Sequence, residues 1–274
     1  MNWQEIADGV FQGRYEPWDV NICVVRASDG LLVVDTRASH RQADELRADL
    51  RRLGNPRWVV NTHAHFDHSF GNYRFGPDSD LALPIYAHTG VPAHLEQYER
   101  PLLARWLASG EGPIDELREV VITPPTQLVD DGATLDLGDR AVKLRHFGRG
   151  HTDNDLVLYV ADADTWLVGD IVEESGPPMY GSGCFPLEWG DTSHELARAL
   201  GPAATVVPGH GRPVNREFVV RQAAELSTVA DVLREVHTSG VAANDAVAAA
   251  ADRWPFPEDG LQPAVDAAWS VLSS

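Results

Sequence analysis

Four potential metal ligands lie within six consecutive residues of the stretch Thr62 to Asn72, which reads THAHFDHSFGN. They are His63, His65, Asp67 and His68. Side chains alternate along an extended segment, so His63 and His65 point the same way and can bind one ion. Asp67 and His68 are adjacent and follow a turn, which suits a second ion beside the first. The stretch therefore predicts a metal site that is completed by ligands from elsewhere in the chain.

Three further residues could supply the missing ligands. A zinc ion takes about four ligands, and a catalytic zinc keeps one position open for water, so one short segment cannot complete two shells. His151 lies in the glycine-rich stretch GRGHTDND, Asp170 ends the apolar run WLVGD, and His210 follows the run VVPG. The glycines around His210 favour a turn and a close approach of the backbone. We expect these residues to converge on the histidine-rich stretch.

Short apolar runs alternate with helical patterns along the chain, which predicts a mixed α/β fold. Helical spacing is found in residues 39–54, in residues 90–109 and through most of the last third. Strands are expected at residues 21–27, 31–36, 57–62, 84–88, 118–122, 133–137, 141–147, 155–160, 165–170 and 204–210. Because strand ends hold loops rigidly, they are suitable places for a site.

The two halves of the chain contain similar strands. The runs LLVVDT and TWLVGD each end near an aspartate, Asp35 and Asp170. The runs RWVVNTHAH and ATVVPGHG each lead into a histidine, His63 and His210. In both halves a helix separates the acidic strand end from the histidine. The pattern suggests that two similar halves bring their strand ends to one shared site.

Length and charge limit the organisation and the partners of the chain. We expect one domain over residues 1–274, with the helical segment 215–274 packed onto it, because no linker or low-complexity segment appears. A net charge of -19 repels phosphate backbones, so no nucleic-acid partner is expected. Apolar runs stay shorter than the roughly 18 to 20 residues that span a bilayer, so no membrane partner is expected. The sequence leaves the oligomeric state open.

The N-terminus and the cysteines indicate a compartment. The first residues have neither a basic start nor an apolar core, so no secretory signal is expected. The two cysteines, Cys23 and Cys184, lie far apart and do not suggest a disulfide framework. A cytoplasmic protein is the simplest prediction.

The complete set of ligands resembles that of a known family. His63, His65, Asp67 and His68, followed by His151, Asp170 and His210, resemble the full ligand pattern of the metallo-β-lactamase superfamily, over roughly residues 9–213. The resemblance implies a four-layer αββα sandwich with a dinuclear metal site along one edge. It assigns His63, His65 and His151 to one ion, assigns Asp67, His68 and His210 to the other, and makes Asp170 the bridge. The expected cofactors are two divalent ions, zinc first, with iron or manganese as alternatives.

The reaction implied by this site is hydrolysis of a small molecule. Two adjacent divalent ions generate a hydroxide that attacks a carbonyl, and Asp67 would both bind the second ion and act in catalysis. True β-lactamases of the superfamily typically carry cysteine or serine where this chain has Asp170, so the glyoxalase II, lactonase and general hydrolase branches are more similar. We expect an ester, thioester or lactone as the substrate.

Other activities remain open at this stage. A mononuclear iron dioxygenase of the persulfide-oxidising type looks similar around HAHFDH, and β-lactam or phosphodiester hydrolysis also belongs to the superfamily. A binding or structural protein, in which metal only staples the fold, is the alternative outside enzymes.

The remaining polar residues receive more modest interpretations. Asp35 and Asp153 are expected to orient the metal-binding histidines rather than to bind metal. Arg149 and Tyr180 either reach the pocket or are a surface arginine and a packed tyrosine. The loop 173–191, rich in glycine, proline and aromatic residues, is expected to line the pocket and to set specificity. No direct role is expected for His40, His88, His94, His146, His194 or His237.

The chemistry predicts a pH dependence. Because water on a catalytic metal ionises near about pH 7, the rate of the chemical step should rise with pH through that value. Single-turnover rates measured across this range check the prediction. A flat profile from about pH 5 to about pH 9 would argue against an attacking hydroxide.

Overall fold

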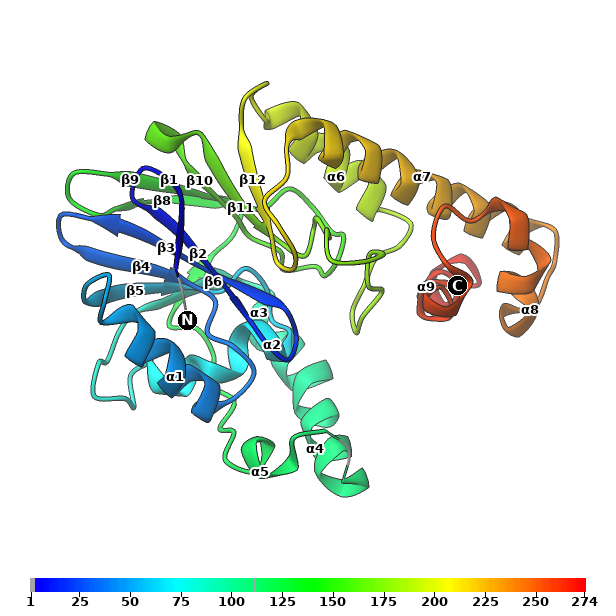
Figure 1. Cartoon of the computed structure of the whole chain (residues 1–274). Coiled ribbons are helices and arrows are strands. Elements are labelled where there is room, and N and C mark those ends of the chain that lie inside the picture. Colours follow the sequence, from blue (N-terminus) through cyan, green and yellow to red (C-terminus); the bar gives the residue numbers. More distant parts are fainter. Residues whose placement is uncertain (1–2, 111) are drawn as a thin grey trace.

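Two β-sheets packed face to face form the centre of the structure, a computed structural model that describes residues 3–110 and 112–274 (Figure 1). The first sheet, in spatial order, contains β1 (Gln4–Ala7), β2 (Val10–Tyr15), β3 (Val20–Ala27), β4 (Gly30–Val34), β5 (Pro56–Val60), β6 (Ile85–His88) and β7 (Gln127–Val129). The second contains β12 (Thr205–Pro208), β11 (Thr165–Gly169), β10 (Val157–Val160), β9 (Ala141–Arg145) and β8 (Gly132–Asp136). Neighbouring strands are parallel from β4 to β7 and between β11 and β12, and antiparallel elsewhere.

Apolar side chains fill the space between the sheets and cover their outer faces. Valine and leucine side chains from both sheets, such as Val25 and Leu158, form the central core. On the outer face of the first sheet lies α1 (His40–Leu50), whose Ala43, Leu46 and Leu50 are buried at helical spacing. On the outer face of the second sheet lie α6 (Trp189–Ala199) and α7 (Arg216–Thr238). The layers follow the order helix, sheet, sheet, helix, which confirms the predicted four-layer αββα sandwich.

Two groups of helices extend this sandwich. The first follows the histidine-rich stretch and consists of α2 (Phe66–Ser69), a 3-10 helix at Phe70–Arg74, α3 (Val91–His94), a π-helical turn at Leu95–Glu99, α4 (Arg100–Ser109) and α5 (Ile114–Leu117). The second consists of α8 (Ala243–Ala249) and α9 (Gln262–Leu272), which pack against the far end of α7 (Figure 1). Short 3-10 helices occupy Ala161–Ala163, Ala251–Arg253 and Glu258–Gly260. No helix among the described residues combines the length and the apolar character needed to cross a bilayer.

One expected strand is absent. Residues 118–122 form a turn and an irregular segment, and the edge of the first sheet is taken by β7 instead. The apolar Val120 and Ile122 pack against Phe70 and its neighbours rather than entering a sheet. A short apolar run looks the same in either setting, because the pattern reports burial and not strand pairing.

The parallel strands of each half end at the same edge of the sandwich. In the first half, β4 and β5 are followed by Asp35 and by the stretch that contains His63. In the second half, β11 and β12 are followed by Asp170 and, after Gly209, by His210. Each pair encloses a helix, α1 or α6, as the internal similarity of the sequence suggested.

A buried asparagine joins the two halves at this edge. Asn21 in β3 is 3% exposed, and its amide donates hydrogen bonds to the carbonyls of Pro208 and Gly211, each at 2.9 Å. The backbone N–H of Asn21 donates to the carbonyl of Gly209 at 2.7 Å. Gln12 on β2 donates to the side-chain oxygen of Asn21 at 2.7 Å. The loop that carries His210 is therefore held by the first sheet as well as by its own.

Replacing Asn21 tests this junction. Asn21→Ala should lower the free energy of unfolding by about 2 kcal/mol, because buried carbonyls lose their donor. Urea denaturation in the presence of a chelator measures the effect without metal binding. Arg14→Ala on the neighbouring strand, where the side chain is 41% exposed and pairs with Asp19, should change it by less than about 1 kcal/mol. Equal effects of the two substitutions would contradict the assigned role.

Candidate metal centre

Three histidines from two segments form the first group of donors. His63 and His65 follow β5, and His151 lies in the turn before β10. Nε2 of His63 and Nε2 of His151 lie 3.1 Å and 2.8 Å from Nδ1 of His65. All three residues are buried. The arrangement directs three ring nitrogens at one point.

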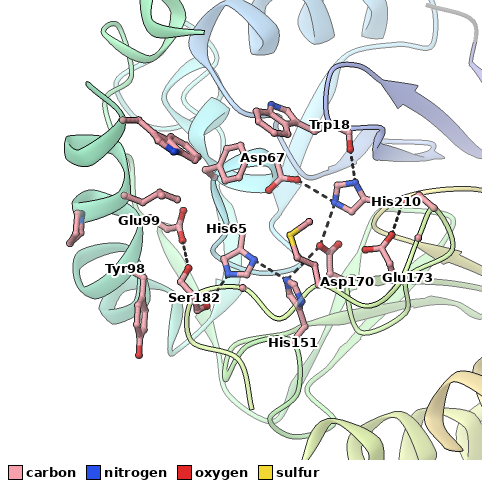
Figure 2. Close-up of a pocket in the computed structure, with 18 of the residues that line it drawn as sticks. Trp18, His65, Asp67, Tyr98, Glu99, His151, Asp170, Glu173, Ser182 and His210 are labelled. Carbon is pink, nitrogen blue, oxygen red and sulfur yellow. Dashed lines mark hydrogen bonds and ion pairs between the residues drawn. The ribbon is translucent and has the colours of Figure 1, made fainter. Parts of the chain in front are cut away.

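A second group lies directly beside the first. Asp67 and His68 occupy the first turn of α2, and His210 follows β12. Nε2 of His210 is 3.2 Å from Oδ2 of Asp67 and 3.3 Å from Nε2 of His68. Figure 2 shows Asp67 and His210 facing His65 and His151 across Asp170. The helical turn separates Asp67 and His68 from His63 and His65, as their spacing in the sequence suggested.

Asp170 lies between the two groups. Its Oδ2 is 3.5 Å from Nε2 of His151 and 3.3 Å from Nε2 of His210, and its Oδ1 is 3.3 Å from Nε2 of His68. The backbone at Gly209 passes so close that a Cβ there would overlap Oδ1 of Asp170. A glycine before His210 is therefore required by the close approach of backbone and carboxylate. The structure brings all seven predicted residues together.

The hydrogen bonds of two rings fit the binding of a cation. Nε2 of His65 donates to the carbonyl of Ser182 at 3.0 Å, and Nδ1 of His210 donates to the carbonyl of Trp18 at 2.8 Å. Because a carbonyl accepts only, the proton of each neutral ring is on the outer nitrogen, and the nitrogen that faces the cluster has a free lone pair. The cluster also contains a buried carboxylate oxygen, Oδ1 of Asp170, with no hydrogen-bond donor. This set of imidazole nitrogens and carboxylates suits zinc, iron or manganese.

Asp35 orients His68 from behind. Its Oδ2 accepts from Nδ1 of His68 at 2.8 Å and from the hydroxyl of Thr62 at 2.8 Å, while its Oδ1 accepts from the backbone N–H of Thr62 at 2.7 Å. The residue has a φ of 68°, in the left-handed region that aspartate tolerates better than most residues. The expectation that Asp35 supports a histidine thus agrees with its contacts. Asp153 is exposed, and its Oδ1 accepts a hydrogen bond from the side-chain amide of Asn154 at 2.9 Å.

Burial and the nearby carboxylates have opposite effects on the pKa values of His68 and His210. Burial disfavours a charged imidazole, but the carboxylates of Asp170 and Asp67 outweigh it and raise the pKa of both histidines. At His63 and His151 burial dominates, and it lowers the pKa of His151 to about 3. Burial would raise the pKa of Asp170, yet the neighbouring histidines hold it well below its usual range. The site therefore keeps its carboxylates ionised and attracts positive charge between Asp67 and Asp170.

A further group of potential ligands, His94 and Glu99 beside His65, does not fit a metal. The side-chain oxygen of Asn154 accepts from the backbone N–H of Ala64 at 3.0 Å, so its amide nitrogen donates to Nδ1 of His94 at 3.1 Å. The proton of His94 is then on Nε2, which faces Oε1 of Glu99 at 3.6 Å. Because the proton occupies the nitrogen that would bind the cation, this pair is a polar contact beside His65 rather than a metal centre.

Five of the seven predicted ligands line a cavity of about 640 Å³. Its floor includes His65, Asp67, His151, Asp170 and His210, and Glu173 lies beside them (Figure 2). Burial and the Asp170 carboxylate raise the pKa of Glu173 to about 8. One wall is largely apolar and contains Trp18, Phe66, Pro101, Leu102 and Trp106, and the polar side chains of Gln97, Glu99 and Arg105 also line the cavity. Another part of the lining comes from the loop before α6, with Ser175, Gly176, Pro177, Met179, Gly181 and Ser182. The predicted loop 173–191 therefore lines the cavity with residues 173–182, whereas its last residues, from Trp189, belong to α6.

Arg149 and Tyr180 do not line this cavity. Arg149 is exposed and pairs with Glu188 at 2.7 Å. Tyr180 is 4% exposed and packs against Trp189 with ring centroids 5.3 Å apart. The alternative interpretation, a surface arginine and a packed tyrosine, is correct. Within the described residues, no potential metal group includes His40, His88, His146, His194 or His237.

Comparison with known proteins identifies the family. A sequence model described as "Metallo-beta-lactamase superfamily" matches residues 15–210. The human protein named acyl-coenzyme A thioesterase MBLAC2 is 27% identical over 260 residues, which cover 86% of this chain and 90% of that protein. The probable metallo-hydrolase YybB of Bacillus subtilis is 27% identical over 189 residues, 65% of this chain and 78% of that protein.

Solved structures agree on the fold. The metallo-β-lactamase FIM-1 from Pseudomonas aeruginosa, in its mono-zinc form, superposes with a TM-score of 0.63 at 19% identity and covers 82% of this chain and 96% of its own. Such a low identity bears on the fold alone. The match to the family model shows that this chain belongs to the metallo-β-lactamase superfamily, and the protein is a metal-dependent hydrolase.

Several residues of the cavity carry no signal in the sequence. Trp18, Phe66 and Trp106 come from three separate segments, and nothing in their local pattern distinguishes them from packed aromatic residues. His94, which the sequence gave no reason to single out, lies 5.3 Å from His65 between ring centroids. Its proximity depends on the path of the chain through α3 and the π-helical turn, which short motifs do not encode.

The contact between Asp35 and His68 leads to a prediction. Asp35→Asn keeps the shape of the side chain but removes the charge that His68 faces, so metal affinity should fall about 10- to 100-fold. Competition with a chromogenic chelator measures the affinity. Asp153→Asn is the control, because Asp153 is exposed and makes no contact with the seven residues. An unchanged affinity in Asp35→Asn would show that the charge of Asp35 does not support the site.

Proposed function

We propose that this protein hydrolyses acyl thioesters with the help of two divalent metal ions, zinc first. The observation that carries the proposal is the convergence of seven donor side chains, five of which line the floor of a cavity that has one largely apolar wall. A charged floor suits a reacting carbonyl, and an apolar wall suits the hydrocarbon part of the same substrate. An ester or a lactone remains the nearest alternative within this reaction type.

The proposed ligands follow the two groups in the structure. His63, His65 and His151 would hold one ion, and Asp67, His68 and His210 would hold the other, with Asp170 between them. Divalent ions bound there would supply a water of lowered pKa and a Lewis acid for the carbonyl. The protein contributes fixed donors, so that little reorganisation is needed during the reaction.

Asp67 is the proposed catalytic residue of the chain. Its Oδ2 lies at the floor of the cavity, 3.2 Å from Nε2 of His210. Burial would raise the pKa of Asp67, but the neighbouring histidines lower it below its usual value, so the group is an ionised acceptor. A carboxylate in this position would accept a hydrogen bond from the attacking water and orient it toward the substrate carbonyl.

A thioester is favoured by two arguments. Proteins named acyl-coenzyme A thioesterase are similar to this chain over most of its length, at 27% identity for the human protein. A thiol has a pKa of about 8.5, so a thiolate departs without a proton donor, and the reaction makes few further demands on the site. The aromatic wall beside the donors would bury part of the acyl group.

Substitution of Asp67 separates an enzyme from a protein whose metal only staples the fold. Asp67→Ala should remain folded, since only one side chain that lines the cavity is shortened, while kcat for a thioester falls at least about 100-fold. Thermal unfolding and steady-state kinetics measure the two effects. Asp191→Ala, an exposed aspartate on α6, is the control. If Asp67→Ala instead unfolds at the same lowered temperature as the metal-free wild-type protein, the metal would have a structural role.

A substrate panel tests the activity itself. The metal-loaded protein should cleave acyl thioesters faster than lactones, oxygen esters, phosphodiesters and β-lactams, and elemental analysis should find two zinc ions per chain. Activity that requires iron and O2 would favour the dioxygenase alternative. Preferential cleavage of a phosphodiester or a β-lactam would overturn the thioester assignment while leaving a metal-dependent hydrolase.

A further inference from the structure

A second, smaller cavity lies next to the metal site. Its volume is about 200 Å³, and it is surrounded by Trp18, Ala38, Ser39, Gln42, Phe66, Trp106, Gly112, Pro113 and Leu117. Trp18, Phe66 and Trp106 line both this recess and the main cavity. The recess therefore begins where the apolar wall of the metal site ends.

Three aromatic rings form the boundary between the two spaces. Phe66 lies edge-on to Trp18, with centroids 5.0 Å apart, and edge-on to Trp106, with centroids 4.9 Å apart. Phe66 also stands between His65 and Asp67 in the sequence, so the boundary begins at the donors themselves. Trp18 is 36% exposed, so part of its side chain is accessible to a ligand.

The lining of the recess has few groups that could form hydrogen bonds with a polar ligand. Its polar side chains, Ser39 and Gln42, both donate to Oε2 of Glu116, at 2.9 Å and 3.0 Å. No charged residue is among those that surround it in the described part of the chain. A polar group entering this space would lose its hydration without replacement, whereas a hydrocarbon would gain from leaving water.

We infer that this recess binds the distal part of an unbranched acyl chain whose carbonyl lies at the metal donors. The inference rests on the proposed thioesterase function and adds a substrate class to it. A volume of 200 Å³ corresponds to about six or seven groups of the size of a water molecule or a methylene. Counting the carbonyl and the next carbon, the inference predicts a preference for acyl groups of medium length, near about eight carbons.

The test is a chain-length series of thioesters with one common thiol, S-acyl-N-acetylcysteamine. For the wild-type protein, kcat/KM should rise about fourfold for each added methylene and level off near about eight carbons. Ala38→Leu narrows the recess, and it should lower the ratio of kcat/KM for the eight-carbon and two-carbon thioesters at least about 10-fold. Leu117→Ala enlarges the recess and should move the preferred length to longer chains.

Ala104→Leu is the matched control, since Ala104 is an exposed position of α4 that lines neither cavity. Its chain-length profile should be that of the wild-type protein. If Ala38→Leu and Leu117→Ala both keep the wild-type profile, the inference is overturned and the thioesterase function stands. Thermal unfolding of each variant shows whether it is folded. If one of the two variants does not fold, the other still tests the inference, because the two substitutions should change the preferred chain length in opposite directions.

If no thioester of any length is cleaved, the proposed function is refuted. A binding measurement then still tests whether the recess binds an apolar chain. Here 1-octanol serves as an uncharged probe, and calorimetric titration measures its Kd. Wild-type protein and Ala104→Leu should bind 1-octanol alike, and Ala38→Leu should bind it at least about 10-fold more weakly. Equal affinities of all three proteins, or no binding, would overturn the assignment of the recess to an apolar chain.

Discussion

The contact of one buried carboxylate, Asp170, with histidines from both donor groups is the interaction on which the site depends. Four histidine nitrogens, from three segments of the chain, lie within 3.9 Å of its two oxygens. Such a charge is too costly to bury unless cations or donors surround it, so the histidines must approach it and cannot drift apart. The backbone is arranged to permit this approach, since only a glycine at position 209 leaves room for the carboxylate.

The two halves of the sandwich meet this requirement in the same way. In each half a parallel pair of strands, joined through one helix, presents an aspartate at the end of the first strand and a histidine after the second. The two aspartates differ, however, in where their side chains lie relative to the site. Asp170 faces the donor groups directly, whereas Asp35 lies behind them and reaches the site through the ring of His68 and the hydroxyl of Thr62, which is 3.1 Å from Nδ1 of His63. The same arrangement of strands thus places Asp170 in the site and Asp35 behind it.

The sequence was most informative where function depends on local order. Spacing alone separated His63 and His65 from Asp67 and His68, because a strand end and a helical turn follow from a few adjacent residues. The strand expected at residues 118–122 was wrong, since an apolar run reports burial without naming its partner. The aromatic boundary and the pair of His94 and Glu99 depend on segments far apart in the chain. Such contacts arise only when the whole fold is assembled, so no short pattern predicts them.

Trp18 connects the donors with the apolar wall. Its carbonyl accepts the proton of Nδ1 of His210 at 2.8 Å, and its ring borders both the main cavity and the recess. The turn between β2 and β3 thus fixes the orientation of a proposed metal ligand and shapes the place where a hydrocarbon would lie. Because both contacts come from one residue, a movement of this turn would disturb the donor set and the apolar wall together. An apolar ligand that covers Trp18 would also exclude water from the donors, and electrostatic interactions strengthen as water leaves. Under the proposed function, recognition of an acyl chain and orientation of His210 would therefore be coupled through one turn of the backbone.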